Sequence, residues 1–121
     1  LIEIYNANLK ISPYFIILLL WYPCFENLFS IIRKLLRKKS ALKPDNDHLH
    51  QLIFVSIKSR YQLKNLPANT ITGIMINTFN LILLYSDSLN PYNTIIQLKL
   101  IITATLSYMF IYILIKKSLN K

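Results

Sequence analysis

The amino-acid sequence predicts an all-α integral membrane protein with three transmembrane helices and a cytoplasmic helix at the membrane interface. Hydrophobic residues make up 54% of the 121 residues and charged residues only 16%, whereas about a quarter of the residues in an average soluble domain are charged. The hydrophobic residues also lie in long runs, as membrane-spanning helices require. Basic residues cluster beside these runs, which is the pattern that sets membrane topology.

The hydrophobic runs have the lengths of transmembrane helices, and the predicted spans are residues 14–32, 70–85 and 94–115. The first run would form about 28 Å of helix, just enough to cross a hydrocarbon core. Ser12 and Pro13 favour a helix start, because proline is tolerated in the first turn. Pro23 predicts a kink near residues 19 to 23, because its ring removes one backbone hydrogen bond.

The net charge of +9 is unevenly distributed. Nine of the 14 basic residues lie between Arg33 and Lys64, and three lie at the C-terminal end. The segments before, between and after the three spans carry 1, 9, 0 and 3 basic residues, so residues 33–68 and the C-terminal tail are predicted to be cytoplasmic. This clustering beside apolar spans argues against a nucleic-acid-binding protein, in which the charge would cover a soluble face.

The first predicted span has two different faces. At helical spacing Glu26, Ser30 and Arg33 share one face, which Arg37 continues. The opposite face carries Phe25, Leu28, Ile32 and Leu36. A charged side chain at the centre of a membrane costs about 2.5–3.5 kcal/mol, so we expect Glu26 to face protein as a polar determinant of the fold. The alternative is an interfacial Glu26 that reaches the surface or pairs with Arg33.

A second, amphipathic helix is expected in the cytoplasmic segment. Pro44 breaks the preceding helix, because the residue before a proline avoids the α region. Asp45 or Asp47 then serves as N-cap of a helix that runs to about Leu63. Its apolar stripe consists of Leu49, Leu52, Ile53 and Ile57, which suits a helix lying in the interface plane. Residues 65–69, with Pro67, are predicted to form a turn.

The second predicted span carries a stripe of small and amide residues. These are Thr70, Gly73, Asn77 and Asn80. Because lipid offers an amide no hydrogen-bond partner, we expect this stripe to pack closely against other helices. Residues 86–93 are predicted to form a polar loop, in which Asp87 carries the one charge.

His48 and His50 are the residues best suited to chemistry. Two positions apart in an α-helix the rings would diverge by about 200°, whereas in an extended segment they would share one face. Two imidazoles are too few for a metal site, so neither is assigned as a metal ligand. Beside basic residues at a membrane surface, the pair suits contact with phosphate. The alternative is an ordinary interfacial pair, beside a basic cluster that sets topology and contacts anionic lipid.

Between residues 23 and 53 these features follow one another in a specific order. The sequence P-x-F-E-N-L-F-S-I-I-R-K is followed by a basic linker and then by P-D-x-x-H-L-H-Q-L. This order resembles the C-terminal part of the bacterial polyprenyl-phosphate N-acetylhexosamine-1-phosphate transferases, which are related to the muramoyl-pentapeptide phosphotransferase. The resemblance covers about residues 13–115. Gln51 departs from it, because many members have a further histidine there.

The resemblance implies a fold and a reaction. The chain would be the C-terminal piece of a larger polytopic bundle in the bacterial inner membrane. Its beginning with Leu1 instead of Met also suggests a fragment. No signal peptide is expected, because no basic n-region and cleavage site precede the first apolar run. Such an enzyme moves a sugar-1-phosphate from a UDP-N-acetylhexosamine, such as UDP-N-acetylglucosamine, to undecaprenyl phosphate and releases UMP. This reaction begins the synthesis of lipopolysaccharide O-antigen and related cell-envelope glycans.

The resemblance also implies a cofactor, partners and site residues. Mg²⁺ is implied, but the aspartates that hold it lie in the N-terminal two thirds of such enzymes, so we expect this segment to hold no catalytic residue and to be inactive alone. His48 and His50 are implied as contacts with the diphosphate or sugar, and Arg33 and Arg37 as phosphate-side charges. The implied partners are a UDP-sugar, polyprenyl phosphate and membrane lipids, with a second copy as a candidate and no nucleic acid.

A different class of function stays open. A small three-span protein could act as a membrane subunit or could bind anionic lipid without catalysing a reaction. The single cysteine, Cys24, excludes an intrachain disulfide and a cysteine-based zinc site in either case. An upstream reading frame with further spans and an aspartate pair would favour the transferase.

Overall fold

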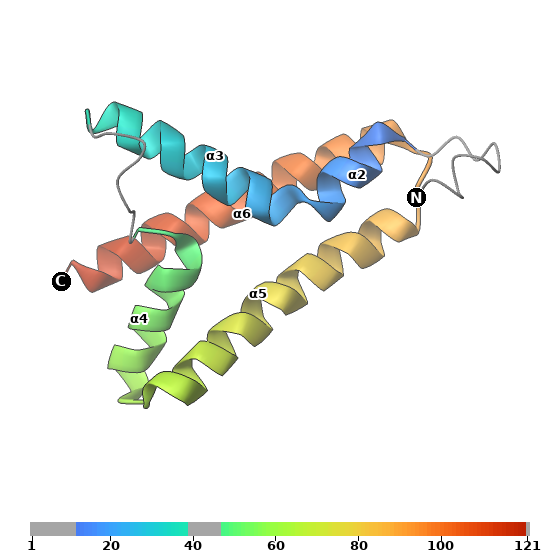
Figure 1. Ribbon diagram of the computed structural model, residues 1–121. Coiled ribbons are helices and arrows are strands. Elements are labelled where there is room, and N and C mark those ends of the chain that lie inside the picture. The colour runs from blue at the N-terminus through green and yellow to red at the C-terminus, as the bar shows by residue number, and fades with distance from the viewer. Residues whose placement is uncertain (1–11, 39–46, 121) are drawn as a thin grey trace.

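Helices and connecting turns make up the whole of residues 12–38 and 47–120, the part of the chain that the computed structural model describes (Figure 1). The helices are α2 (Pro13–Leu19), α3 (Trp21–Leu36), α4 (Leu49–Tyr61), α5 (Asn65–Ser88) and α6 (Thr94–Leu119). In Figure 1, α5 and α6 meet at one end and spread apart toward the other, where α4 lies between them and packs against both.

Two helices, α5 and α6, are long and apolar enough to cross a membrane. At 1.5 Å per residue they measure about 36 and 39 Å, against a hydrocarbon core of about 30 Å. Helix α6 begins at Thr94, as predicted, because the side-chain oxygen of Asn93 accepts hydrogen bonds from the N–H groups of Ile95 and Ile96 at 3.1 and 3.2 Å. It ends four residues later than predicted, since the basic tail continues the helix to Leu119.

Helix α5 begins at Asn65, so the turn predicted for residues 65–69 was wrong. Pro67 lies in the first turn of the helix, where its missing N–H would have no intrahelical partner in any case. At its other end the helix runs to Ser88, which shortens the predicted loop. The preceding helix, α4, ends two residues before the predicted position, at Tyr61, because Gln62 adopts a left-handed backbone conformation (φ 51°).

The first predicted span is broken. Helices α2 and α3 meet at Leu20 and are bent by 73° relative to each other. Pro23 lies in the first turn of α3 and has no N–H to donate to the carbonyl of Leu19, so the helix cannot continue through this point undisturbed. The predicted kink is therefore confirmed, but it divides the span into two helices. Within residues 12–38 and 47–120 there are two candidate spans, or three if the bent pair counts as one.

Aromatic side chains join α3 to α6. On α3 the rings of Trp21, Phe25 and Phe29 stack at centroid distances of 5.3 and 6.0 Å. From α6, Tyr108 meets Phe25 edge-on at 4.9 Å. One turn further, Tyr112 meets Phe29 edge-on at 5.0 Å. We call these five residues the aromatic column, and each such ring pair adds about 0.5–1.5 kcal/mol beyond the burial of its area.

The two predicted faces of α3 are largely as expected. Glu26, Ser30 and Arg33 are buried, whereas Leu28, Ile32 and Leu36 on the opposite side are exposed. Phe25 differs from its predicted neighbours, because it turns inward and packs in the aromatic column. The polar face of α3 therefore points into the bundle.

Most of the predicted polar stripe of α5 is exposed. Thr70, Gly73 and Asn77 are exposed, and no other part of the described chain lies within 4 Å of the place that a Gly73 Cβ would take. The buried residues of α5 are Ala68, Thr72, Leu83 and Asp87. Asn80, the fourth residue of the stripe, is half-buried, and Gly73 borders the groove between α4 and α5. Close packing of the whole stripe against another helix is therefore not seen within the described residues.

Replacing Tyr108 by alanine tests the aromatic column. Tyr108 is 1% exposed and contacts the rings of all four aromatic residues of α3. We expect Tyr108→Ala to lower the free energy of unfolding in detergent micelles by about 3 kcal/mol, as for other large buried side chains. The matched control, Phe110→Ala on the same helix, removes an exposed ring and should have a change within about 0.5 kcal/mol. Equal effects would contradict the packing of α3 on α6.

Candidate functional site

The polar residues singled out from the sequence gather at one end of the bundle. This basic end is the end at which α3 and α6 finish and α4 begins, and it carries Arg33, Arg37 and Lys116. In Figure 1 it lies on the left, opposite the turn between α5 and α6. Its residues come from segments that are far apart in the sequence, so it is a product of the tertiary structure.

Glu26 joins α3 to the start of α4. One carboxylate oxygen, Oε1, accepts a hydrogen bond from the backbone N–H of Leu49 at 2.9 Å and lies 3.0 Å from Nδ1 of His48. Leu49 is the first residue of α4, so a side chain 23 residues earlier in the sequence caps this helix. A carboxylate is well suited to the task, since it also faces the positive end of the helix dipole.

This capping contact corrects one prediction and agrees with another. Asp47 does not cap α4, because the residue at the N-cap position is His48 and the capping oxygen comes from Glu26; Asp45 lies outside the described residues. Glu26 is 6% exposed and faces the protein interior, as its helical spacing predicted. The phenol groups of Tyr22 and Tyr108 also lie close to its carboxylate.

The two histidines lie side by side. His48 has an extended backbone (φ −69°, ψ 146°), whereas His50 belongs to the first turn of α4. Because the pair straddles the helix start, the rings do not diverge: their centroids are 5.6 Å apart and their planes differ by 16°. Glu26 contacts Nδ1 of His48, which favours the proton on that nitrogen and leaves Nε2 on the far edge of the ring. His50 is exposed.

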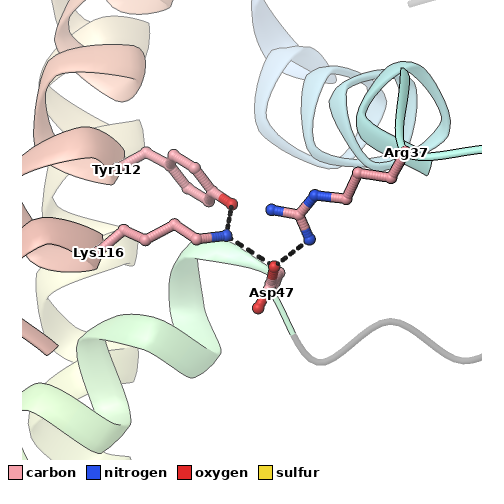
Figure 2. A network of polar contacts seen from close by, with 4 residues as sticks. All are labelled: Arg37, Asp47, Tyr112 and Lys116. Carbon is pink, nitrogen blue, oxygen red and sulfur yellow. Dashed lines mark hydrogen bonds and ion pairs between the residues drawn. The ribbon is translucent and has the colours of Figure 1, made fainter. Parts of the chain in front are cut away.

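A second cluster surrounds Asp47 (Figure 2). Its Oδ2 accepts hydrogen bonds from Nζ of Lys116 at 2.7 Å and from Nη1 of Arg37 at 2.8 Å. Lys116 also donates to the hydroxyl of Tyr112 at 3.1 Å. The hydrogen bond from Lys116 lowers the pKa of Asp47 below its ordinary value; partial burial opposes this shift, and Arg37 adds to it. Asp47 thus connects α3, α4 and α6.

The two arginines predicted to bind substrate have different partners. The guanidinium of Arg33 lies over the rings of Phe29 and Tyr112, at 5.2 and 5.4 Å from their centroids. Such cation–π contacts fix the orientation of a buried arginine. Arg37 meets Asp47 instead. The sequence-predicted residues therefore form two groups, the histidines with Glu26 and the arginines with Lys116.

Each group borders a groove of its own. A groove of about 680 Å³ lies between α4 and the first half of α5, and its lining includes His50, Gln51, Asn65, Asn69 and Thr72. These amide, hydroxyl and imidazole groups can form hydrogen bonds with the hydroxyl and amide groups of a sugar. A second groove, of about 320 Å³, lies between α3 and α6 and includes both arginines and Lys116.

Several residues of the site were not found from the sequence. Lys116 was interpreted as part of a basic tail, and Tyr112 and Tyr22 were not singled out. The spacing of Tyr112 and Lys116, one helical turn apart, places them on one face. No local signal brings residue 116 to residue 47, however, because this contact depends on the packing of α4 against α6.

The donors at this end do not fit the Mg²⁺ that the resemblance implies. Within residues 12–38 and 47–120, no three side chains of histidine, cysteine, aspartate or glutamate come together. Mg²⁺ prefers oxygen ligands in octahedral geometry, and the carboxylates here have other partners: Glu26 caps α4, and Asp47 binds Arg37 and Lys116. We therefore derive no step through a metal ion held by these residues.

No family model, curated protein sequence or solved structure matches this chain. The resemblance described above therefore stays a prediction.

The pH dependence of stability tests the Asp47 cluster. The pKa of Asp47 is lower in the folded chain, so its contribution is fully present above its unfolded pKa, about 3.9, and is lost as the pH falls through the lower folded pKa. Because the pair is partly exposed, we expect Asp47→Asn to destabilise the protein at pH 7 by about 1 kcal/mol or less. The difference from the wild type should shrink in thermal unfolding scans below about pH 4.

Lys116→Gln should reproduce this loss at pH 7, whereas Lys117→Gln, a change at the exposed neighbour, should leave stability unchanged. A difference between wild type and Asp47→Asn that stays constant from pH 3 to pH 7 would rule out the charged interaction.

Proposed function

We propose that this chain is the C-terminal membrane segment of a glycosyl-1-phosphate transferase. The enzyme would move the sugar-1-phosphate of a UDP-N-acetylhexosamine to undecaprenyl phosphate and release UMP. One observation carries the proposal: the two sequence motifs behind the resemblance meet in space. Glu26 of the first motif contacts both His48 and the N–H of Leu49 in the second, at 3.0 and 2.9 Å. The motifs are thus parts of one structural unit.

The proposed reaction brings two anionic substrates together at a membrane surface, so it requires charge neutralisation and alignment. The histidine pair suits the nucleotide-sugar side. When protonated, each ring donates charge-assisted hydrogen bonds to phosphate oxygens. The groove beside His50 is mainly apolar, and Gln51, Asn65, Asn69 and Thr72 in its lining offer amide and hydroxyl groups to the sugar. Arg33 and Arg37 are proposed as positive charges on the phosphate side, in agreement with their position on the same face of α3 as Glu26.

Glu26 is proposed as a positioning residue. It contacts no substrate in this proposal but holds Nδ1 of His48, so that Nε2, when it also carries a proton, can donate a hydrogen bond to a phosphate oxygen. The resident Mg²⁺, when bound by carboxylates outside this segment, would neutralise diphosphate charge. The residues of this segment would bind and orient the substrates.

The proposed location is the bacterial inner membrane, with the basic end on the cytoplasmic side. The proposal requires residues 33–68 and the C-terminal tail to lie on the same side of the membrane. The hydrogen bonds from Arg37 and Lys116 to Asp47 support this arrangement, because they hold both segments within one cluster. The alternative is a small membrane subunit without catalytic activity. The basic groove between α3 and α6 would suit a subunit that binds anionic lipid.

Replacing His50 tests the nucleotide-sugar contact in the product of the complete reading frame. We expect His50→Ala to lower kcat/KM for the UDP-sugar by the equivalent of roughly 1.5–3 kcal/mol, as for a lost hydrogen bond to a charged group. The Mg²⁺ concentration that gives half-maximal UMP release should stay the same, since His50 is not proposed as a metal ligand. Failure of the wild-type protein to release UMP from any UDP-N-acetylhexosamine would favour the subunit alternative.

Replacing Glu26 by glutamine tests the positioning role. The amide oxygen can still accept the hydrogen bond from Leu49, so the fold should be kept. A neutral amide holds Nδ1 of His48 less firmly than a carboxylate does. We therefore expect Glu26→Gln to raise KM for the UDP-sugar while the thermal midpoint stays at the wild-type value. Leu28→Ala, on the exposed side of the same helix, should leave both quantities unchanged. A lower thermal midpoint with an unchanged KM would assign Glu26 to the fold alone.

A further inference from the structure

The groove between α3 and α6 combines two properties that belong together in lipid binding. Its walls are apolar and consist of Phe29, Ile32, Leu36, Met109 and Ile113. Its other lining residues include the basic side chains of Arg33, Arg37 and Lys116, and no carboxylate is among its described lining residues. Basic pockets between membrane helices are typical sites for anionic lipid headgroups.

The positive groups of the groove are held in place by the fold. Arg33 is only 7% exposed, and its guanidinium is oriented by the rings of Phe29 and Tyr112. Lys116 is oriented by Tyr112 and Asp47, and Asp47 also fixes Arg37. Figure 2 shows Arg37 and Lys116 reaching the same carboxylate from two different helices. Preorganised donors of this kind bind an anion without ordering long side chains first.

The apolar walls indicate that the anion carries a hydrocarbon chain. Leu36 and Ile113, from the two sides of the groove, are 81% and 58% exposed. Beside helices that are apolar enough to cross a membrane, such side chains face lipid chains rather than water. The basic groups lie at the ends of α3 and α6, where a headgroup would lie.

We propose that the α3–α6 groove binds an anionic glycerophospholipid of the adjacent leaflet, with its phosphate against Arg33, Arg37 and Lys116 and one acyl chain along the apolar walls. This proposal gives Arg33 and Arg37 a ligand other than the acceptor phosphate of the transferase reaction, so the two ligands compete for one groove and the polyprenyl phosphate result below distinguishes them. The proposal does not use the groove beside His50, which lies between other helices and shares none of these lining residues. The bound lipid would hold α3 to α6 at the basic end.

The experiment measures stabilisation by lipid in mixed detergent micelles. The thermal midpoint of the chain is followed as phosphatidylglycerol or zwitterionic phosphatidylcholine is added, because a ligand that binds only the folded state raises the midpoint. We expect phosphatidylglycerol to raise the midpoint in a saturable manner and phosphatidylcholine to have no saturable effect. Each variant is compared with itself without lipid, so a change in its basal stability does not affect the result.

Two pairs of variants locate the site. Lys116→Gln should weaken the apparent affinity for phosphatidylglycerol about fivefold, as expected for one basic residue, whereas Lys117→Gln should not. Ile113→Trp places a ring in the groove and should also weaken binding. Leu114→Trp, at an exposed neighbour that does not line the groove, should bind phosphatidylglycerol as the wild type does.

Three results would overturn the proposal. Equal effects of phosphatidylglycerol and phosphatidylcholine would mean that the charges do not select the lipid. Saturable stabilisation by polyprenyl phosphate alone would assign the groove to the acceptor substrate instead. A thermal midpoint that does not change with added lipid but rises with protein concentration would indicate that a second copy of the chain covers the groove.

Discussion

The hydrogen bond from Leu49 to Glu26 is the constraint on which the rest of the basic end depends. A buried carboxylate is costly unless its oxygens are hydrogen-bonded, and the first N–H groups of a helix need acceptors. In this fold the buried Oε1 of Glu26 meets both requirements by capping α4, whereas Oε2 has no hydrogen-bond partner among the described residues. The contact fixes where α4 begins relative to α3. The stacked His48 and His50 follow from that position, as does the place of Asp47 just before the helix.

Asp47 extends this arrangement to α6. Its Oδ2 lies between Lys116 and Arg37 at 2.7 and 2.8 Å, so that one carboxylate offsets charge from two helices that would otherwise repel each other. The aromatic column holds the same helices together through ring contacts. As a result His50 borders a groove on the α4–α5 side, and Arg33, Arg37 and Lys116 line a groove on the α3–α6 side. Two anionic ligands of different chemistry can thus be held apart at one end of the bundle.

The break between α2 and α3 allows α3 to run toward the basic end while α2 packs elsewhere. Helix α2 packs against α5 and α6 near their shared turn, where the Ser12 N–H donates to the Pro91 carbonyl at 3.3 Å and the hydroxyls of Ser12 and Thr94 are 3.3 Å apart. The 73° bend then directs α3 along a different line, with its polar face toward α4. A straight helix could not satisfy both contacts, so Pro23 has a structural role in assembling the site.

The sequence by itself determined the features that depend on neighbours along the chain. Helical spacing placed Glu26 inside, Pro23 predicted a kink where the helix breaks, and the start of α6 at Thr94 was correct. These signals are local because side-chain periodicity and backbone restrictions act within one or two turns. Only the tertiary structure decided which carboxylate caps α4, which lysine reaches Asp47, and which side of α5 is covered. The contact between Asp47 and Lys116 joins residues 69 positions apart. From the local sequence alone, the cap expected for α4 is Asp47 just before the helix, and not Glu26 on another helix. Such choices depend on where whole helices dock, because a buried polar atom takes its partner from whichever helix the packing brings beside it.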